Sequence, residues 1–458
     1  MPEDLFPVPD TAPNGVDSIS GIAPPAAKRL PAAMRILIVT NYFAPEAGAA
    51  AVRLTRLARR LRERGHEITV LTSLPHYPQG RIHASHRGRA VVTTELDGIR
   101  VVQTWLLATA SPRISRKLPS QLSFMASALL FGLRIPRPDV VLVEAQPVFT
   151  GIAGVLLALV KRRPYVLNVS DLWPDHLLSV GAITDTHPFY RLARRMVDFT
   201  YRRAERIIAM SPRWAEAIAS HLRGHEDKIS TVYNGVDLER FRPRLEVAEF
   251  RRQHGLGNER IISFIGTFST QYDFDAMLAV AEHFDRQDGV RILFIGQGSQ
   301  EATLRERLHR FSRLSWIRWL AHEQMPQAWN VSWLTYWAIR DHPLYDGTIP
   351  AKAYEAMACG VPMVAAMTGV TADIIKASGA GATVGCGEVA GLIREIAKVL
   401  ESDSLRQRHS EAARRYAEVH YDAERAALAY ERALAEAVGQ PDKIALSASR
   451  ELAGRPRM

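Results

Sequence analysis

The sequence is poor in cysteine and lacks the common metal-binding patterns. Its 458 residues include two cysteines, Cys359 and Cys386. Two thiols cannot build a framework of disulfides, so we expect a reducing compartment. The sequence also has no CxxC pair, no HExxH motif and no histidines at ligand spacing, and we therefore expect no bound metal.

Long hydrophobic runs are missing as well. The longest lie near Phe124–Leu133 and Gly151–Val160, and both are too short to cross a bilayer. The N-terminal residues 1–33 are rich in proline, alanine and glycine, but they lack the basic-then-apolar order of a secretory signal. We expect residues 1–33 to be a disordered extension, or a start assigned too early before Met34, and the protein to be cytoplasmic.

The charge balance is basic, with a formal net charge of +10 that comes mostly from arginine. A basic balance suggests an acidic partner, which could be a phosphorylated substrate, an anionic lipid or nucleic acid. The sequence has no zinc finger, basic zipper or aromatic-basic sheet motif, so nucleic acid is the weakest of the three. A soluble protein with an arginine-rich surface is the simpler explanation of the composition alone.

Short apolar segments alternate with helical patterns, which predicts parallel sheets covered by helices. The first unit is a strand at Arg35–Thr40, a helix at Ala50–Arg64 closed by Gly65, and a strand at Glu67–Leu71. Further strands are predicted at Asp139–Val143, Tyr165–Val169, Arg206–Met210, Lys228–Val232, Arg260–Ile265, Arg291–Ile295 and Pro362–Ala366. We expect an α/β protein of two doubly wound, Rossmann-like domains, residues 34–240 and 241–420, facing a central cleft. Ligands of such sheets bind beyond the carboxyl ends of the strands.

The segment Val232–Pro243 reads VYNGVDLERFRP. Taken alone, its NGVD stretch would be a turn or a hinge. The segment resembles the interdomain signature of family 4 retaining glycosyltransferases with the GT-B fold, which is roughly PNGVD followed by F and P. Tyr233 stands where that pattern has proline.

The segment Ile349–Pro362 reads IPAKAYEAMACGVP and is similar to the donor-binding motif PxKxxEaMAcGxPvv of the same family. Pro350 suits the first turn of a helix, and Lys352 and Glu355 share one helix face. The positive helix start and Lys352 would attract a donor diphosphate, while Glu355 could accept hydrogens from ribose or sugar hydroxyls. An ordinary surface ion pair between the two side chains is the alternative.

Three loops are candidates for the acceptor side. Asn168–Asp175 reads NVSDLWPD and resembles the DLWP segment of family members that build bacterial surface polysaccharides, so Asp171 would have a catalytic or sugar-binding role; an Asx cap explains it nearly as well. The loop Asn41–Gly48 follows the first predicted strand. In the family this loop approaches the donor phosphate and the acceptor, and Gly48 would allow a close approach of its backbone. His76, in another loop after a strand, could join this site or simply be solvated.

The sequence departs from the family pattern in two places. Relatives often carry a glutamate eight positions before the conserved one of the donor motif, where this chain has Gly347, and Asp346 is the candidate substitute. The loop Gly266–Asp273 has no basic residue. We therefore expect the donor phosphate to contact Lys352, the main-chain NH groups of that loop, and Thr267.

The resemblance covers about residues 34–438 and implies a hexosyltransferase. The expected reaction moves a sugar, with retention, from a UDP- or GDP-sugar to a lipid-linked saccharide in cell-surface polysaccharide biosynthesis. The nucleotide-sugar is a substrate, so no cofactor is implied. Asp171 and Glu355 would be catalytic, a last helix at 421–439 would cross back to the first domain, and 440–458 would be a disordered tail. A sugar-nucleotide epimerase and a non-catalytic nucleotide-sugar-binding scaffold remain alternatives.

Two further segments have unusual composition. Arg113–Leu133 begins with basic residues and continues as an apolar helical stretch. It could dock peripherally on an anionic membrane surface, or it could pack on the core of the first domain. Five of the eight tryptophans fall in Trp316–Trp337, where core packing is favoured over stacking on a base or sugar.

Overall fold

The structure is a computed structural model that describes residues 32–439, apart from 47, 78, 112, 176–177, 179–182, 223 and 343–344. The extension predicted at 1–33 lies outside the described residues except for residues 32 and 33. The tail predicted at 440–458 lies wholly outside them.

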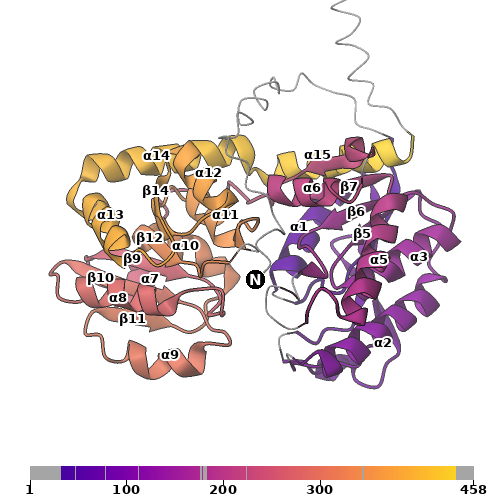
Figure 1. The fold of residues 1–458 in the computed structure, drawn as a ribbon, viewed down its shortest axis with the longest axis horizontal. Coiled ribbons are helices and arrows are strands. Elements are labelled where there is room, and N and C mark those ends of the chain that lie inside the picture. Colours follow the sequence, from indigo (N-terminus) through magenta and orange to yellow (C-terminus); the bar gives the residue numbers. More distant parts are fainter. Residues whose placement is uncertain are drawn as a thin grey trace, which may run out of the picture. The chain divides into compact units, whose positions relative to one another are not determined.

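The described chain forms two parallel-sheet α/β domains, which confirms the predicted fold class (Figure 1). The strands of the first domain are β1 (Arg35–Val39), β2 (Glu67–Ser73), β3 (Val91–Leu96), β4 (Ile99–Thr104), β5 (Val140–Glu144), β6 (Tyr165–Val169), β7 (Arg206–Ala209) and β8 (Ile229–Thr231). Those of the second are β9 (Arg260–Ile265), β10 (Val290–Ile295), β11 (Leu314–Ile317), β12 (Ser332–Ala338), β13 (Met363–Ala366) and β14 (Gly381–Val384).

Helices connect the strands. The first domain contains α1 (Ala49–Glu63), α2 (Ile114–Gly132), α3 (Val148–Val160), α5 (Pro188–Arg203) and α6 (Pro212–Ala219). The second contains α7 (Ala248–Gln253), α8 (Phe274–Phe284), α9 (Glu301–Leu308), α10 (Met325–Val331), α11 (Ala351–Ala358), α12 (Val370–Ser378), α13 (Val389–Glu401) and α14 (Asp403–His420), and α15 (Ala423–Ala437) follows. Short 3-10 turns lie at Ala84–His86, Glu226–Lys228 and His322–Gln324.

Both sheets have the strand order of a dinucleotide-binding fold. The first is ordered β3-β4-β2-β1-β5-β6-β7-β8 and is parallel except for β3, which pairs antiparallel with β4. The second is ordered β11-β10-β9-β12-β13-β14 and is parallel throughout. In each sheet the order reverses once, between β1 and β5 and between β9 and β12. A reversal of this kind leaves a crevice at the carboxyl ends of the two strands, where ligands bind.

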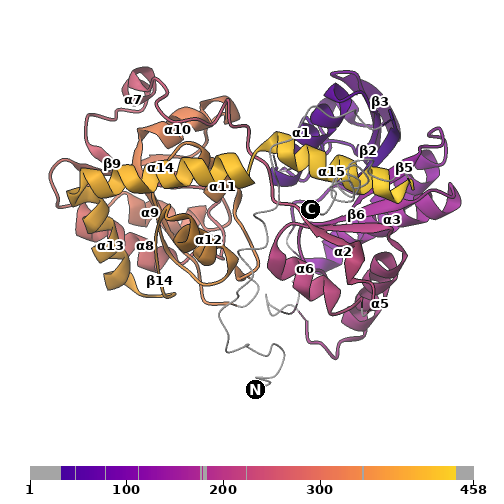
Figure 2. The same ribbon diagram turned by 90° about the horizontal axis from the view of Figure 1, so that it is seen from above.

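The sheet of the first domain is covered on both faces. Leu37 and Val39 face a core built with α2, α3, α5 and α6. Ile36 and Ile38, which alternate with them along β1, face a core built with α1 and α15. The last helix α15, yellow in Figure 2, therefore packs on the first domain through α1, β6 and β7.

The segment that resembles an interdomain signature lies beside the start of α15. Val236 pairs with Asp422 in a parallel bridge, and its NH donates to the carbonyl of Tyr421 at 2.7 Å. Gly235 is needed here because a Cβ would lie 2.4 Å from the Cα of Ala423. Tyr233, at the position of the family's proline, packs edge-on against Tyr421 with ring centroids 5.6 Å apart.

The structure adds five strands that the sequence reasoning did not assign: β3, β4, β11, β12 and β14. In β3 and β11 every residue is at least partly exposed, so these strands lack the continuous apolar run by which buried parallel strands are recognised. β12 lies in the tryptophan-rich segment. Trp329 and Trp337 there are fully buried, as expected, whereas Trp319 is 67% exposed.

Candidate functional site

A cavity of about 660 Å³ lies at the switch point of the first sheet. Asn41 and Tyr42 follow β1, Glu144 ends β5, and Ser170 and Asp171 follow β6; all of them line the cavity. The carboxyl ends of neighbouring strands thus contribute its polar residues, as the general rule for open α/β sheets requires. Much of the remaining lining comes from the starts of α2 and α3 and from α5, and Ala50, His76, Thr109 and Trp173 line the cavity too.

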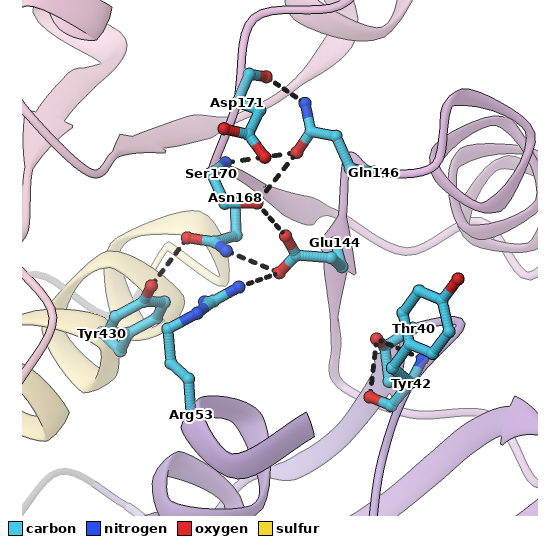
Figure 3. A network of polar contacts seen from close by, with 9 residues as sticks. All are labelled: Thr40, Tyr42, Arg53, Glu144, Gln146, Asn168, Ser170, Asp171 and Tyr430. Carbon is cyan, nitrogen blue, oxygen red and sulfur yellow. Dashed lines mark hydrogen bonds and ion pairs between the residues drawn. The ribbon is translucent and has the colours of Figure 1, made fainter. Parts of the chain in front are cut away.

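Glu144 is the centre of a hydrogen-bonded network beneath this cavity (Figure 3). Its side chain is 2% exposed, and Oε2 accepts from Nη2 of Arg53 at 2.8 Å and from Nδ2 of Asn168 at 2.6 Å. The hydroxyl of Ser170 donates to Oε1 at 2.7 Å. The hydroxyl of Tyr430, from α15, donates to Oδ1 of Asn168 at 2.6 Å. A buried carboxylate with these donors is charge-paired and fully engaged.

Asp171 extends from this network into the cavity. Its main-chain carbonyl accepts a hydrogen bond from Nε2 of Gln146, and Oε1 of Gln146 accepts from the NH of Ser170 at 3.2 Å. The residue is exposed to the cavity but closely surrounded by protein atoms. That partial burial raises the pKa of Asp171 to about 6, and the charge of Glu144 adds to the rise while Arg53 opposes it. Asp171 therefore exchanges protons near neutral pH.

The structure places His76 and Gly48 close to each other. Glu46 joins their loops, because Oε1 accepts from the NH groups of His76 and Tyr77 at 2.8 Å each. A Cβ on Gly48 would lie 3.3 Å from the ring of Tyr77. His76 lines the cavity and is 7% exposed, so it is not a solvated histidine; Gly48 is not among the lining residues.

The ring of His76 is held in one orientation. It stacks on Tyr42 with centroids 5.6 Å apart, and Nδ1 lies 3.0 Å from the carbonyl oxygen of Leu74. Burial lowers the pKa of His76, which favours the neutral ring. With Nδ1–H donating to Leu74, Nε2 is left as a hydrogen-bond acceptor.

In the second domain, Lys352 lies under the switch point of the sheet. Its side chain is 7% exposed, and Nζ lies 3.8 Å from the ring centroid of Phe264, 4.2 Å from that of Tyr272 and 5.5 Å from that of Trp337. Within the described part of the chain Nζ has no hydrogen-bond partner, which excludes the ordinary surface ion pair with Glu355. Burial among the rings lowers the pKa of Lys352 well below its ordinary value.

The loop that follows β9 covers Lys352. A Cβ on Gly266 would lie 2.9 Å from Nζ of Lys352, so only glycine lets the lysine approach this loop so closely. A Cβ on Gly296, after β10, would lie 1.9 Å from the carbonyl oxygen of Gly266. The two glycines thus allow the loops to stack, and the neighbouring Thr267 is exposed.

Pro350 and Glu355 belong to the helix that carries Lys352. The sequence predicted Pro350 in the first turn of this helix. In the structure Pro350 is the N-cap residue of α11, one position before the first turn. The carboxylate of Glu355 accepts from Nε1 of Trp329 at 2.9 Å. Burial raises the pKa of Glu355, and the Trp329 hydrogen bond and the charges of Arg56 and Arg240 oppose this rise. The structure brings Glu355 and Lys352 to one helix, but it does not pair them.

The missing family glutamate has a packing explanation. A Cβ on Gly347 would lie 2.5 Å from the ring of Trp214, and the hydroxyl of Ser211 donates to the carbonyl of Gly347 at 2.7 Å. A side chain at position 347 would meet Trp214. The neighbouring Asp346 accepts from the hydroxyl of Thr368 at 2.7 Å.

The described residues contain neither a cluster of metal-ligating side chains nor a helix that could cross a membrane. No group of three or more His, Cys, Asp and Glu side chains there could hold a metal ion. No helix among these residues combines the length and the apolar character that crossing a membrane requires.

Comparison with protein families gives the same class for both domains. Residues 48–235 match the family model described as Glycosyl transferase 4-like domain, and residues 246–416 match Glycosyl transferases group 1. Together the two matches cover most of the chain. The chain therefore belongs to the family 4 type of glycosyltransferases with the GT-B fold, enzymes that use nucleotide-sugar donors.

Individual relatives are distant but cover most of the chain. A GDP-mannose-dependent alpha-mannosyltransferase from Mycobacterium tuberculosis is 24% identical over 387 residues, which are 83% of this chain and 91% of the relative. The crystal structure of HepE from Anabaena in complex with UDP has a TM-score of 0.65 at 18% identity and covers 88% of this chain and 100% of HepE. WaaG, a glycosyltransferase involved in lipopolysaccharide biosynthesis, has a TM-score of 0.63 at 14% identity, covering 87% and 99%.

Several residues of the site were not found from the sequence. Glu144, Arg53, Asn168 and Tyr430 form the network under Asp171, but none was a candidate. Glu144 could have been recognised, because it is a charged residue directly after the apolar stretch VVLV, at the carboxyl end of a predicted strand. Tyr430 has no comparable signal, since it comes from a helix far along the chain.

Proposed function

We propose that this protein transfers a hexose from a UDP- or GDP-sugar to a lipid-linked saccharide, with retention, in the synthesis of a cell-surface polysaccharide. The observation that carries the proposal is the cavity at the first sheet's switch point, with a carboxyl group of pKa about 6 in its lining. The named relatives support the donor and the pathway, since they include a GDP-mannose-dependent enzyme, a UDP complex and a lipopolysaccharide enzyme.

The donor end of the reaction belongs to the second domain. The diphosphate would lie over Gly266 and Thr267, where Nζ of Lys352 approaches the loop from below. When the bond between the anomeric carbon and the diphosphate oxygen breaks, negative charge grows on the leaving group. The ammonium of Lys352, the NH groups of the Gly266 loop and the start of α11 after Pro350 would stabilise that charge. Glu355 would accept hydrogens from donor hydroxyls.

The acceptor end belongs to the cavity of the first domain. The acceptor hydroxyl would lie near Asp171 and Nε2 of His76, with Gly48 allowing the first loop to approach the donor. As the acceptor oxygen bonds to the anomeric carbon, its proton passes to the Asp171 carboxylate and from there to solvent. A carboxyl group with a pKa near 6 is suited to this exchange at neutral pH.

The proposed location is the inner face of the cytoplasmic membrane. Along α2 and just after it, Leu122, Leu130 and Leu133 are 38%, 56% and 52% exposed. Arg116 and Lys117, in the first turn of the same helix, are exposed too. Exposed leucines beside basic side chains favour peripheral contact with an anionic surface, where a lipid-linked acceptor would be reached.

Nucleotide binding and donor hydrolysis test the proposal. The melting temperature of the full chain is measured with UDP, GDP and their sugars, because a ligand of the folded state raises it. We expect one nucleotide to stabilise the protein. Without acceptor, the corresponding nucleotide-sugar should be hydrolysed slowly, and Lys352→Ala should abolish this hydrolysis. Stabilisation without any hydrolysis or transfer would favour the scaffold alternative. Unchanged binding and turnover in Lys352→Ala would refute the role given to this lysine.

A further inference from the structure

The cavity of the first domain has two chemically different sides. Its polar floor is formed at the carboxyl ends of the strands and includes Glu144, Ser170 and Asp171. The helices α2, α3 and α5 contribute apolar side chains to the lining. We call this set of side chains the apolar wall; it consists of Leu118, Val148, Phe149, Phe189, Leu192 and Met196.

The apolar wall is poorly suited to a second sugar. Its side chains offer no hydrogen bond to a hydroxyl, and a hydroxyl buried without a partner costs free energy. Leu192 is 58% exposed at this wall, so an apolar surface remains in contact with water. Hydrocarbon placed against it would remove that surface from water, which is favourable. The volume of about 660 Å³ is typical of sites that enclose a whole ligand rather than a single small group.

Basic residues lie on α2 next to Leu118, the residue that this helix contributes to the apolar wall. Lys117 and Gln121, one helical turn apart, both line the cavity, and Lys117 is exposed. Arg116 precedes Lys117 and is exposed as well. The wall also continues outward along α2, because Leu118 in the cavity is followed one turn later by the exposed Leu122. A ligand with an anionic group and a hydrocarbon chain matches this sequence of surfaces.

These observations, taken with the proposed transferase function, assign the ligand of the wall. We infer that the apolar wall is a subsite for the hydrocarbon chain of an acceptor whose sugar is joined to that chain through phosphate. The sugar lies on the floor near Asp171, the phosphate beside Lys117, and the first units of the chain against Leu192 and Met196. The enzyme thus recognises the lipid part of its acceptor directly, in addition to any contact with the membrane.

Binding of farnesyl phosphate and inorganic phosphate to the full chain tests the subsite. Calorimetry is done below the aggregation concentration of the lipid, with the donor site filled by whichever of UDP and GDP stabilises the protein. We expect farnesyl phosphate to bind at least about tenfold more tightly than inorganic phosphate, because its chain is removed from water. Leu192→Gln and Met196→Gln should each remove most of this difference, whereas Lys117→Gln should weaken both ligands.

Leu130→Gln is the matched control. The exposed fraction of Leu130, 56%, is similar to the 58% of Leu192, but Leu130 does not line the cavity. It should leave farnesyl phosphate binding unchanged. Equal binding of the two phosphates, or equal losses in Leu192→Gln and Leu130→Gln, would overturn the subsite. Nucleotide binding is measured in the same samples: if UDP or GDP binds normally while the chain makes no difference, the subsite fails and the transferase proposal stands. If neither nucleotide binds, the transferase proposal fails first.

Discussion

At the scale of single residues, the proposed chemistry depends on two groups whose proton affinities are changed by their surroundings. Lys352 is buried, and the loss of water around its amine disfavours its charged form. Asp171 is held beside Glu144, which disfavours its charged form as well. Burial thus favours the neutral form of both groups, and an anion bound beside Lys352 would favour its charged form.

Because burial lowers the pKa of Lys352, we predict that the protein takes up a proton when the donor binds. In the free protein burial lowers the pKa of Lys352, and a bound diphosphate raises it again. Above the lysine's pKa in the free protein, the Kd for the nucleotide should therefore rise with pH, by up to about tenfold per pH unit. The proton uptake is measured by calorimetry in buffers of different ionisation enthalpy. The measurement is made above pH ~7.5, where the phosphates are already ionised. Lys352→Met should abolish it, and pH-independent binding without proton uptake would contradict the prediction.

We expect an acid limb in the pH profile of kcat/KM near pH 6, because the proposed transfer needs the carboxylate of Asp171. Burial is the main cause of the raised pKa and Glu144 contributes to it, so Glu144→Gln should lower the pKa of Asp171. The acid limb should then move to lower pH, measured as initial rates from pH 4.5 to 8. Tyr430→Phe removes a hydroxyl from the same network without changing charge, and its limb should stay in place. A limb that moves upward in Glu144→Gln would contradict the assignment.

At the scale of elements, α15 is held to the first domain by a buried ionic cluster. Glu431 is 2% exposed, and its carboxylate lies 2.7 Å from Nε of Arg64 and 2.9 Å from Nε2 of His66. Nδ1 of His66 in turn accepts from the NH of Met34, the residue that precedes β1. The final helix is therefore tied to the first strand and to the end of α1.

The cluster predicts unequal effects of two substitutions on α15. Glu431→Ala leaves buried partners without their acceptor and should lower the free energy of unfolding by about 3–5 kcal/mol. Glu436→Ala removes a pair with Arg206 whose side chains are 39% and 29% exposed, so it should cost about 0–1 kcal/mol. Urea unfolding followed by circular dichroism measures both. Losses of similar size in the two variants would show that burial of Glu431 does not matter.

Elements also show where sequence reasoning succeeded and where it failed. Strands that are buried on both faces, such as β1, β5 and β9, carry continuous apolar runs and were located to within a residue or two. The edge strand β3 (VVTTEL) is exposed and half polar, so neither a continuous apolar run nor an alternation marks it. It exists because β4 offers an unpaired edge, which is a property of the sheet and not of the segment.

At the scale of the whole molecule, the net charge of +10 and the exposed leucines of α2 predict binding to anionic vesicles. Full-length protein should co-sediment with phosphatidylglycerol vesicles but weakly with phosphatidylcholine, and salt should release it. Replacing Arg113, Arg116 and Lys117 with serine should lower the binding free energy by roughly 3 kcal/mol, at about 1 kcal/mol per charge.

The control replaces three basic residues of the second domain: Arg394, Lys398 and Arg408. These are exposed on α13 and α14 and carry the same total charge. The control should bind nearly as well as the unchanged protein. If both triple variants lose binding equally, the attraction comes from net charge and α2 is not the contact surface.

From the amino-acid sequence alone one could predict the two-domain α/β class, the family, the loops that carry Asp171 and His76, and the helix that carries Lys352. These features could be predicted because apolar runs and motif spacing are properties of single segments. A polar loop after a buried strand indicates a candidate ligand site wherever it occurs. The surroundings of these groups, in contrast, became known from the folded structure. The hydroxyl of Tyr430 reaches Asn168 across 262 positions of sequence, and three separate strands or loops enclose Lys352. Proton affinity and pocket shape depend on such neighbours, which no single segment specifies.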